Sequence, residues 1–580
     1  MLGGMERRIW HRHYDPGVPV SLDYRDQTVV DFLDHTVREH GDRPALAFLN
    51  RRFDYGQLRQ QVDRLATALY QLGVEPGVRV AVHLPNLPQT VISIFAVLRL
   101  GGQVVMTNPL YTEREIEHQW NDSECRVAIT GDWLWEQRVR GIRSKLPVRD
   151  YVITSIPEYL RFPLNLLAPL KLKRMEPPMT AKVEWGPGVH SFRRLVRDHP
   201  AMAPRPKLSL DDTAVVQYTG GTTGVSKGAE LTHRNLSCNV QQVTAWFTGV
   251  EPGREVMLSA LPMFHVFGLT VCTLWPVYVG AKIVVQTDPR NIAQMIRAIE
   301  KEKVTLFPAV PALFNAINQW PDIAKSDLSS VKYCFSGSAP LPEDVQVRFE
   351  ELTGARIVEG FGLTETSPVV TANPLEGLRK IGSIGIPLPD TDARIVDPED
   401  GVTEMPVGES GELAVKGPQV MKGYLNRPEE TAQVLRGGWL YTGDLATMDE
   451  DGYFRIVGRK KDMILASGYN VYPDEIDRVL MAHPDVFESA TIGVPDPKRG
   501  ETVKAFLVPH PGKEIDLESV KQWARENLAA YKVPDHWEVR EELPKSSMMK
   551  LLRRVLREEE IRRRQAAESD AGGREGGGQG

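Results

Sequence analysis

Hydrophobic positions in the first 130 residues repeat with two different periods that alternate along the chain. Apolar side chains recur at helical spacing from Tyr55 to Leu72 and stop at Gly73, which predicts a helix. Thr112 and Glu115 have the spacing of a capping box and predict a helix from there to about residue 124. The same patterns predict a further helix at 88–100 and strands at 78–85, 103–109 and 126–130. Helices that alternate with short apolar strands are typical of a largely parallel sheet covered on both faces.

The rhythm of the pattern changes twice further along the chain. It returns between residues 280 and 360, but residues 380–460 show short strands with Gly and Pro turns. From residue 461 on, the elements are fewer and mixed, with a helix predicted at 472–483 and a strand at 502–509. The changes predict a domain boundary near residues 459–462.

Three regions follow from this boundary. We expect a large N-terminal domain over residues 1–460, a small α+β domain over 461–564 and a tail over 565–580. The tail has no apolar side chain beyond alanine, which predicts disorder.

Two apolar segments raise the question of membrane contact. Residues 256–281 contain no charged side chain, but two prolines, two glycines and His265 interrupt them, which favours a buried strand, turn and helix over a spanning helix. Residues 159–174 are short, apolar and flanked by basic side chains. They fit either contact with a membrane surface or packing on their own domain, and both interpretations stay open.

Composition excludes several classes of protein. The 580 residues carry 70 basic and 76 acidic side chains, a net charge of -6, which argues against binding of nucleic acid by bulk charge. Four scattered cysteines form no CxxC pair, which fits a reducing compartment and gives no zinc pattern. The polar N-terminus lacks the apolar core of a secretory signal, so we expect a cytoplasmic protein.

A loop rich in glycine and hydroxyl groups follows Tyr218. Glycines let backbone N–H groups approach phosphate oxygens, and the hydroxyls and a lysine add further donors, which suits an ATP triphosphate. The Walker pattern fails, because Gly228 follows Lys227. The hydrolase pattern GxSxG matches residues 224–228, so a serine hydrolase stays as an alternative. The candidate ATP-binding residues of this loop are Thr219, Gly220, Gly221, Thr222, Thr223, Gly224, Ser226 and Lys227.

Carboxylates and bases further along the chain complement this loop. Thr364 and Glu365 offer a hydroxyl for a phosphate and a carboxylate for Mg²⁺. Asp444 follows Gly443, and a buried carboxylate there would accept from both hydroxyls of a ribose. Arg459 and Lys550 are the basic candidates near the C-terminus.

Taken together and in this order, these segments resemble the AMP-forming acyl-CoA synthetases over about residues 25–556. The resemblance is closest to bacterial long-chain-fatty-acid–CoA ligases. It rests on the motifs YTGGTTGVSKG, LPMFHVFG, SGSAPL, EGFGLTE, GELAVKGPQVMKGY, GWLYTGD, GRKKDMI and PKSSMMK. It implies an α/β fold with mostly parallel sheets, a distorted β-barrel subdomain and a small C-terminal lid domain.

The resemblance also implies roles for single residues. The loop from Thr219 to Lys227 would wrap the β- and γ-phosphates, Thr364 would meet the α-phosphate, and Glu365 would hold Mg²⁺, with Thr223 as a second candidate for the metal. Lys550 would stabilise the charge that develops during adenylation, and Lys461 matches the hinge. The adenine would lie between Phe361 and the segment Gly337, Ser338, Ala339 and Pro340, and Glu359, Gly360 and Gly362 are further ATP-binding candidates. The ribose would be held by Asp444 and Arg459. CoA would pass Ser467, Gly468 and Tyr469, and His265 would be a gating or positioning residue.

The implied reaction has two steps. A fatty carboxylate attacks the α-phosphate of MgATP to give acyl-AMP and pyrophosphate, and CoA then takes the acyl group. Phe264 is followed by His265, where amino-acid-activating relatives carry an aspartate, so an amino-acid substrate is disfavoured. His265 is equally well interpreted as a core histidine. Met549 stands where the family has glycine, which puts the strength of adenylation in question.

Other functions stay open at this point. An aryl-acid or medium-chain CoA ligase, a luciferase-like oxygenase and a non-catalytic homologue that binds nucleotide or acyl chains share these motifs. The partners implied are fatty acid, ATP and CoA, with a homodimer as a further expectation and with peripheral membrane contact through residues 159–174.

Overall fold

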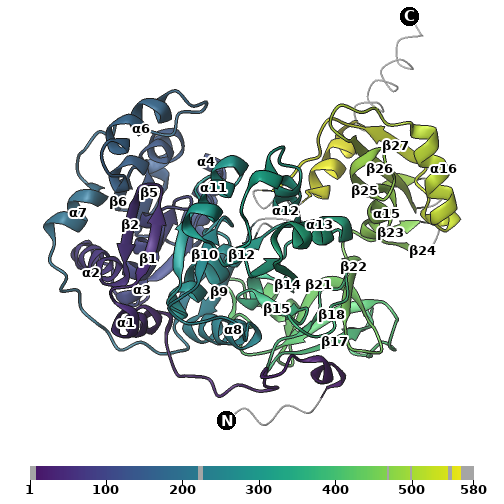
Figure 1. Cartoon of the computed structure of the whole chain (residues 1–580), viewed down its shortest axis with the longest axis horizontal. Helices are drawn as coiled ribbons and strands as arrows, with labels where there is room; N and C mark the ends of the chain where they lie inside the picture. The colour runs from purple at the N-terminus through teal and green to yellow at the C-terminus, as the bar shows by residue number, and fades with distance from the viewer. Residues whose placement is uncertain (1–7, 220–225, 467–468, 497–499, 547–550, 564–580) are drawn as a thin grey trace, which may run out of the picture.

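The computed structural model describes residues 8–219, 226–466, 469–496, 500–546 and 551–563. The fold contains two large sheets, a smaller antiparallel sheet and a C-terminal α+β unit (Figure 1). The predicted α/β class is confirmed.

The first large sheet has eight strands, and its central part is parallel. At one edge, β9 pairs antiparallel with both β8 and β19. β8 and β9 form a hairpin, and the loop between them contains the glycine- and threonine-rich segment. In spatial order the strands are β19 (Gly423–Tyr424), β9 (Gly228–Thr232), β8 (Thr213–Tyr218), β4 (Gln103–Met106), β3 (Arg79–His83), β5 (Val127–Gly131), β6 (Asp150–Thr154) and β7 (Val189–Ser191).

The second large sheet has nine strands, with a parallel centre and antiparallel pairs at its two ends. Its order is β16 (Ile386–Pro387), β15 (Val369–Ala372), β14 (Arg356–Gly362), β13 (Tyr333–Ser336), β12 (Leu306–Ala309), β10 (Val256–Ser259), β11 (Lys282–Val285), β1 (Pro44–Phe48) and β2 (Arg51–Asp54).

Helices cover these sheets as the apolar periodicity predicts. In α3 (Pro88–Arg99) every residue is buried, which fits its apolar character on all sides. In α4 (Glu113–Asp122) the capping box of Thr112 and Glu115 is present, and the helix ends two residues before the predicted end. The other helices of the two-sheet region are α1 (Val29–His40), α2 (Tyr55–Gln71), α6 (Leu164–Lys173), α7 (Phe192–Asp198), α8 (His233–Trp246), α11 (Ile292–Glu302), α12 (Pro311–Asn318) and α13 (Glu343–Thr353).

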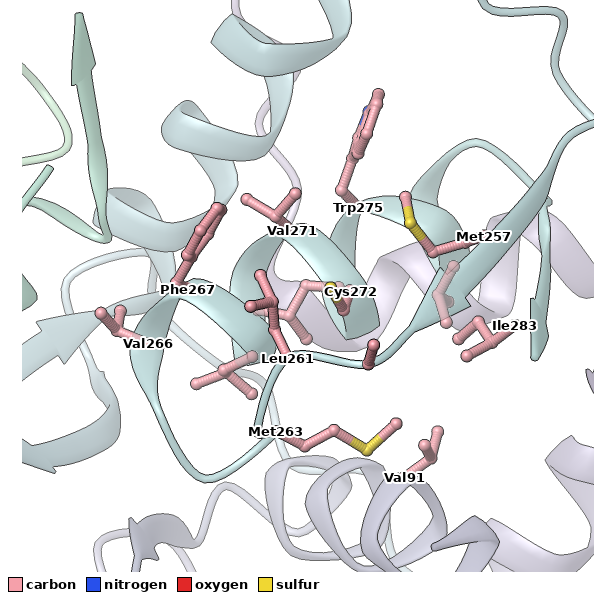
Figure 2. Packing of buried hydrophobic residues seen from close by; sticks show 14 of the residues in the cluster. Val91, Met257, Leu261, Met263, Val266, Phe267, Val271, Cys272, Trp275 and Ile283 are labelled. Atoms are coloured by element: carbon pink, nitrogen blue, oxygen red, sulfur yellow. The ribbon is translucent and has the colours of Figure 1, made fainter. Parts of the chain in front are cut away.

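The apolar stretch 256–281 is a strand followed by short helical pieces, as predicted. After β10 come α9 (Val266–Leu269), a π-helical turn (Thr270–Leu274) and α10 (Trp275–Tyr278). Figure 2 shows Leu261, Met263, Phe267 and Trp275 in one cluster of buried side chains. Among the described residues, no helix is long and apolar enough to cross a membrane.

Short antiparallel strands build the region from residue 392 to 459, which agrees with the predicted change of pattern. They form one five-stranded sheet with the short helix α14 (Pro428–Val434) beside it. The strands are β17 (Asp392–Val396), β18 (Gly411–Lys416), β20 (Leu435–Arg436), β21 (Trp439–Met448) and β22 (Phe454–Arg459).

The C-terminal unit has hydrophobic cores of its own. Its two clusters draw only on residues from 464 onward, whereas the buried clusters of the preceding region end at Phe454. The predicted boundary at 460/461 falls between these cores. The elements of the unit are β23 (Ile464–Ala466), β24 (Tyr469–Val471), α15 (Pro473–Met481), β25 (Val486–Asp496), β26 (Gly500–Pro509), α16 (Leu517–Asn527) and β27 (His536–Val539).

Candidate active site

Two of the predicted segments meet at the carboxyl ends of neighbouring parallel strands. β13 and β14 pair with Ser336 opposite Glu359, so residues 337–340 and 359–362 begin side by side. Crevices beyond the carboxyl ends of parallel strands are the usual binding place in open α/β sheets. Residues 338–340 are exposed and the Phe361 ring is half-buried, which leaves both segments accessible to a ligand.

Two glycines allow the chain to pass closely here. A Cβ at Gly360 would lie 2.8 Å from the Phe335 ring and from the Thr371 carbonyl oxygen. A Cβ at Gly362 would lie 2.2 Å from the Pro368 carbonyl oxygen, a distance that no side chain tolerates. The glycines of the EGFG segment are therefore required by packing.

Glu359 is a buried acid at the base of these segments. Its Oε1 accepts a hydrogen bond from the Leu341 backbone N–H at 3.2 Å, and its Oε2 has no partner among the described residues. Burial raises the pKa of Glu359 to about 8, although Arg455 and Arg478 act in the opposite direction. Glu359 thus combines a buried acceptor with a proton that it keeps near neutral pH.

Glu365, Tyr424 and Lys227 come together from three distant parts of the sequence. The Tyr424 hydroxyl donates to Glu365 Oε1 at 2.7 Å, and the Lys227 Nζ lies 5.2 Å from the centroid of the Tyr424 ring. The Met421 backbone N–H donates to the Glu365 carbonyl oxygen at 2.7 Å, which fixes the short helical turn Thr364–Thr366. Tyr424 therefore contacts a lysine through its ring and a carboxylate through its hydroxyl.

The glycine-rich loop is a hairpin connection between β8 and β9. The nucleophilic serine of an α/β-hydrolase sits on a strand-to-helix turn, but the described ends of this loop lead from one strand into the next. The Ser226 hydroxyl donates to the Thr219 carbonyl oxygen at 2.5 Å. The serine-hydrolase alternative lacks its required geometry. Gly220, Gly221, Thr222, Thr223 and Gly224 lie outside the described residues.

Asp444 and Arg459 face each other across the β21–β22 pair. The Arg459 Nε lies 3.0 Å from Asp444 Oδ1. Asp444 is buried, and its Oδ2 has no hydrogen-bond partner among the described residues. A buried carboxylate oxygen without a donor costs free energy unless a ligand or water satisfies it, so this oxygen is a candidate acceptor for a ligand.

Lys461 lies within electrostatic reach of this pair. It is exposed, but desolvation by neighbouring protein lowers its pKa, and Arg459 adds to that effect. The carboxylates of Asp444 and Glu365 act in the opposite direction. The hinge candidate is therefore electrostatically coupled to the predicted ribose and metal positions.

His265 stands at the start of α9. Its Nδ1 accepts from the Phe267 backbone N–H at 3.3 Å, so it caps the helix. The preceding loop is fixed by Asn86, whose side chain bonds the backbone of Ser259, Leu261 and Met263. The capping bond adds a structural role to the gating role that the resemblance implies.

The remaining candidates belong to the C-terminal unit. Ser467, Gly468, Met549 and Lys550 lie outside the described residues, and Tyr469 is described only as part of β24. Beside the hinge candidate, Arg557 Nη1 donates to Asp462 Oδ1 at 2.9 Å and Arg557 Nη2 donates to the Asp462 carbonyl oxygen at 3.1 Å. The segment that follows the predicted catalytic lysine is thus tied to the hinge.

Comparison with known proteins agrees with this arrangement. The family model for AMP-binding enzymes matches residues 33–425, and the model for the AMP-binding enzyme C-terminal domain matches residues 475–550. The chain belongs to the AMP-binding enzyme family. Relatives of this AMP-binding enzyme include a "Long-chain-fatty-acid--CoA ligase" of Bacillus subtilis, 43% identical over 95% of this chain and 98% of that one. Another, of Escherichia coli O6:H1, is 40% identical over the same shares.

More distant relatives act on other acids. A "Feruloyl-CoA synthase" of Amycolatopsis sp is 36% identical over 87% of this AMP-binding enzyme and 93% of its own chain. The crystal structure of the anthranilate CoA ligase AuaEII with anthranoyl-AMP has a TM-score of 0.81 and 27% identity, covering 95% and 98% of the two chains. ATP-bound MatB from Rhodopseudomonas palustris has a TM-score of 0.79 and 28% identity, covering 92% and 99%.

Tyr424 is a residue of the site to which sequence reasoning gave no role. It ends the motif GELAVKGPQVMKGY, so its position was visible in the sequence. Its contact with Glu365 spans 59 residues of sequence and depends on the edge pairing of β19 with β9. A local pattern carries no signal for such a contact.

Proposed function

We propose that this AMP-binding enzyme is a long-chain fatty acid–CoA ligase. One observation carries the proposal: curated long-chain-fatty-acid–CoA ligases about 40% identical to it align with nearly its whole length. The reaction activates the acid with MgATP to acyl-AMP and pyrophosphate, and CoA then takes the acyl group and releases AMP.

In the first step, the fatty carboxylate oxygen attacks the α-phosphorus and the bond to pyrophosphate breaks. Asp444 Oδ2 accepts from the ribose hydroxyls, and Arg459 holds the carboxylate in place. The Phe361 ring and residues 337–340 bind the adenine between them. Thr364 meets the α-phosphate, and the loop from Thr219 to Lys227 donates to the outer phosphates. This arrangement orients ATP for in-line attack.

A magnesium ion that enters with ATP fits the donor set. The described residues hold no cluster of three metal-ligating side chains, and Mg²⁺ bound through nucleotide phosphates needs only one or two carboxylates. Glu365 would hold it, because the Tyr424 hydroxyl occupies only Oε1; Thr223 is the second candidate. The ion supplies charge neutralisation on the phosphates when bound.

Lys550 neutralises the negative charge that grows on the α-phosphate and carboxylate during the first step. The C-terminal unit then turns about Lys461, which withdraws Lys550 and brings in Ser467, Gly468 and Tyr469 to line the path for CoA. The CoA sulfur attacks the acyl carbon, the bond to AMP breaks, and the thiol proton leaves to solvent. His265 positions the acyl carbonyl beside this path.

The apolar residues near His265, where the acyl group would bind, favour an alkyl substrate. The loop before α9 and the buried cluster that it joins are apolar, and each buried CH₂ group of a substrate contributes about 0.8 kcal/mol. An aryl or medium-chain acid is the second candidate, because relatives of the chain include feruloyl- and anthranilate-CoA-forming enzymes.

We also infer that the enzyme works in the cytoplasm on small molecules, without nucleic acid, and touches lipid through residues 159–174. A homodimer stays a proposal that sedimentation of the purified chain tests. The predicted division into residues 1–460, 461–564 and the tail 565–580 is part of the same proposal.

Pyrophosphate release tests the proposal. The purified chain is given MgATP with acids of about 8 to 18 carbons, ferulate or anthranilate, with and without CoA. Over this range of chain lengths the free energy of burying the alkyl chain changes by several kcal/mol, at about 0.8 kcal/mol per CH₂ group. Fastest CoA-dependent turnover with long-chain acids supports the proposal. Preference for an aryl acid supports the second candidate, and absence of turnover in every arm contradicts both. Lys550→Ala, which should lower pyrophosphate release about 100-fold or more, serves as the low-activity control.

A further inference from the structure

The segment 162–175 carries a dense group of exposed apolar side chains. Its short helix α6 buries none of its residues. The exposed fractions reach 76% at Phe162, 63% at Leu166, 55% at Leu167 and 61% at Leu170. Leu166, Leu167 and Leu170 are spaced i, i+1, i+4, which places them on one side of the helix.

The opposite side of α6 is fixed to the protein. Ala168 and Leu172 pack against the main hydrophobic core. Upstream, the Asn50 side chain donates to the Arg161 carbonyl oxygen at 2.9 Å and accepts from the Arg161 N–H at 3.0 Å. Downstream, the Met179 N–H donates to the Leu172 carbonyl oxygen at 3.0 Å. The exposed leucines therefore lie on a helix whose opposite side is packed against the protein.

The four charged side chains within residues 161–174 are all basic, and the first acid after them is the exposed Glu176. Residues 160–175 contain Arg161, Lys171, Lys173 and Arg174, all exposed, and no Asp or Glu. Lys173 and Arg174 follow Leu170 by three and four positions, so they lie on the same side of the helix as the leucines. This local charge is opposite in sign to the net charge of -6 of the whole chain.

We propose that this surface, defined as the exposed side of residues 161–174, docks on an anionic lipid bilayer. The apolar side chains enter the boundary between head groups and acyl chains, and the four basic groups meet the anionic head groups. Ten helical residues extend only about 15 Å, so α6 lies along the bilayer surface. The four basic side chains favour a lipid surface over an apolar protein partner, since an anionic bilayer supplies both negative head groups and an apolar interior.

The position of α6 leaves the two-step reaction free to proceed on a docked enzyme. Figure 1 shows α6 at the end of the molecule away from the C-terminal unit. Docking through α6 thus leaves that unit room to turn. The inference rests on the proposed function in one respect, because a bilayer is where a water-insoluble acyl substrate is concentrated.

Vesicle binding of the full chain tests the inference without any substrate. We expect co-sedimentation with vesicles of phosphatidylcholine and phosphatidylglycerol, and weaker binding to phosphatidylcholine alone or in high salt. The triple variant Leu166→Gln/Leu167→Gln/Leu170→Gln should lower the partition coefficient by about tenfold or more. Lys171→Glu/Lys173→Glu/Arg174→Glu should abolish the preference for the anionic lipid. The matched control Val402→Gln/Val407→Gln changes exposed apolar residues elsewhere and should bind like the parent.

Two outcomes overturn the inference. Binding that is equal in the parent and both triple variants shows that α6 is not the docking surface. Loss of a dimer in the leucine variant, with vesicle binding unchanged, assigns the surface to a second copy of the chain. Ligase activity on fatty acid dissolved below its solubility limit should be equal in parent and variants, so that a failed ligase assay and a failed vesicle assay remain distinguishable.

Discussion

The candidate site before residue 460, called the wall below, and the C-terminal unit hold their functional groups in different ways. The wall comprises Asp444, Arg459, Glu365 and Tyr424. In the wall, Asp444 is buried and paired with Arg459, and Glu365 is fixed by Tyr424. The C-terminal unit has separate hydrophobic cores, and Arg557 ties its last helical segment to Asp462 next to the hinge candidate. Under the proposed function, the wall would hold the nucleotide through the whole reaction and the C-terminal unit would move as one body.

Adenylation and transfer to CoA should depend on the wall and on the C-terminal unit in different ways. A substitution in the wall should weaken ATP binding or adenylation in either orientation of the C-terminal unit. A change in the unit should affect one step more than the other, since its residues approach the site in only one orientation.

The largest effect is expected at Lys550, which belongs to the moving part. Lys550→Ala removes the charge that we propose to stabilise the transition state of adenylation, and it should lower pyrophosphate release about 100-fold or more. Acyl transfer from supplied acyl-AMP to CoA should stay within about twofold of the parent, because stabilisation lost only in the first step leaves the second unchanged. Lys513→Ala, an exposed lysine of the same unit, is the control. Equal loss of both steps would contradict the assignment.

In the wall, Asp444→Asn should raise the KM for ATP by about tenfold to a hundredfold. The amide replaces one acceptor oxygen by a donor and breaks the charge pair with Arg459, and hydrogen bonds to charged groups contribute about 1.5–3 kcal/mol. Steady-state kinetics with varied ATP measures it. Asp449→Asn, at the turn after β21, keeps the parent's KM. An unchanged KM in Asp444→Asn would remove the ribose from this position.

A smaller effect is expected at Tyr424. Tyr424→Phe keeps the ring beside Lys227 but loses the hydrogen bond to Glu365, which should slow adenylation by about threefold to tenfold. Tyr441→Phe also loses a buried hydroxyl hydrogen bond, to the Gly401 carbonyl oxygen, and controls for stability. If the two variants adenylate equally fast, Tyr424 does not position the carboxylate.

The buried acid of the wall should appear in the pH dependence of stability. The pKa of Glu359 is raised from 4.5 to about 8, so the native state keeps a proton that the unfolded chain releases between these values. Stability contributed by the protonated acid is therefore lost as the pH rises through this window, by up to about 1.4 kcal/mol per pH unit. Glu359→Gln should flatten this slope in urea unfolding between pH 5 and 8, whereas the exposed Glu343→Gln should keep it. A parent slope that Glu359→Gln leaves unchanged would contradict the buried-acid interpretation.

Local patterns predicted those parts of the fold that local physics determines. The capping box at Thr112 and the mostly apolar helix α3 need only neighbouring residues for their interpretation. The segment 256–281 was recognisable as buried because prolines and glycines interrupt its apolar run. The π-helical turn inside it was not predicted, since it depends on how the run packs.

Within the site, the sequence indicated which residue types act but not how they meet. Asp444 and Arg459 are 15 positions apart, and only the β21–β22 register places them opposite each other. The bond from Tyr424 to Glu365 depends on long-range pairing as well. The two interpretations of residues 159–174 could not be separated by pattern, because exposure and packing of α6 are both tertiary properties.

A block of the hinge tests the division between a fixed wall and a moving unit most directly. Proline at position 461 fixes φ, and the Lys461 N–H donates no backbone hydrogen bond to the described residues, so Lys461→Pro should hinder rotation without breaking one. Both half-reactions are measured by rapid quench on one preparation. The account predicts acyl-AMP formation within about threefold of the parent and a loss of about tenfold or more in transfer to CoA. Equal rates of transfer in parent and variant, or an equal loss in both steps, would contradict it.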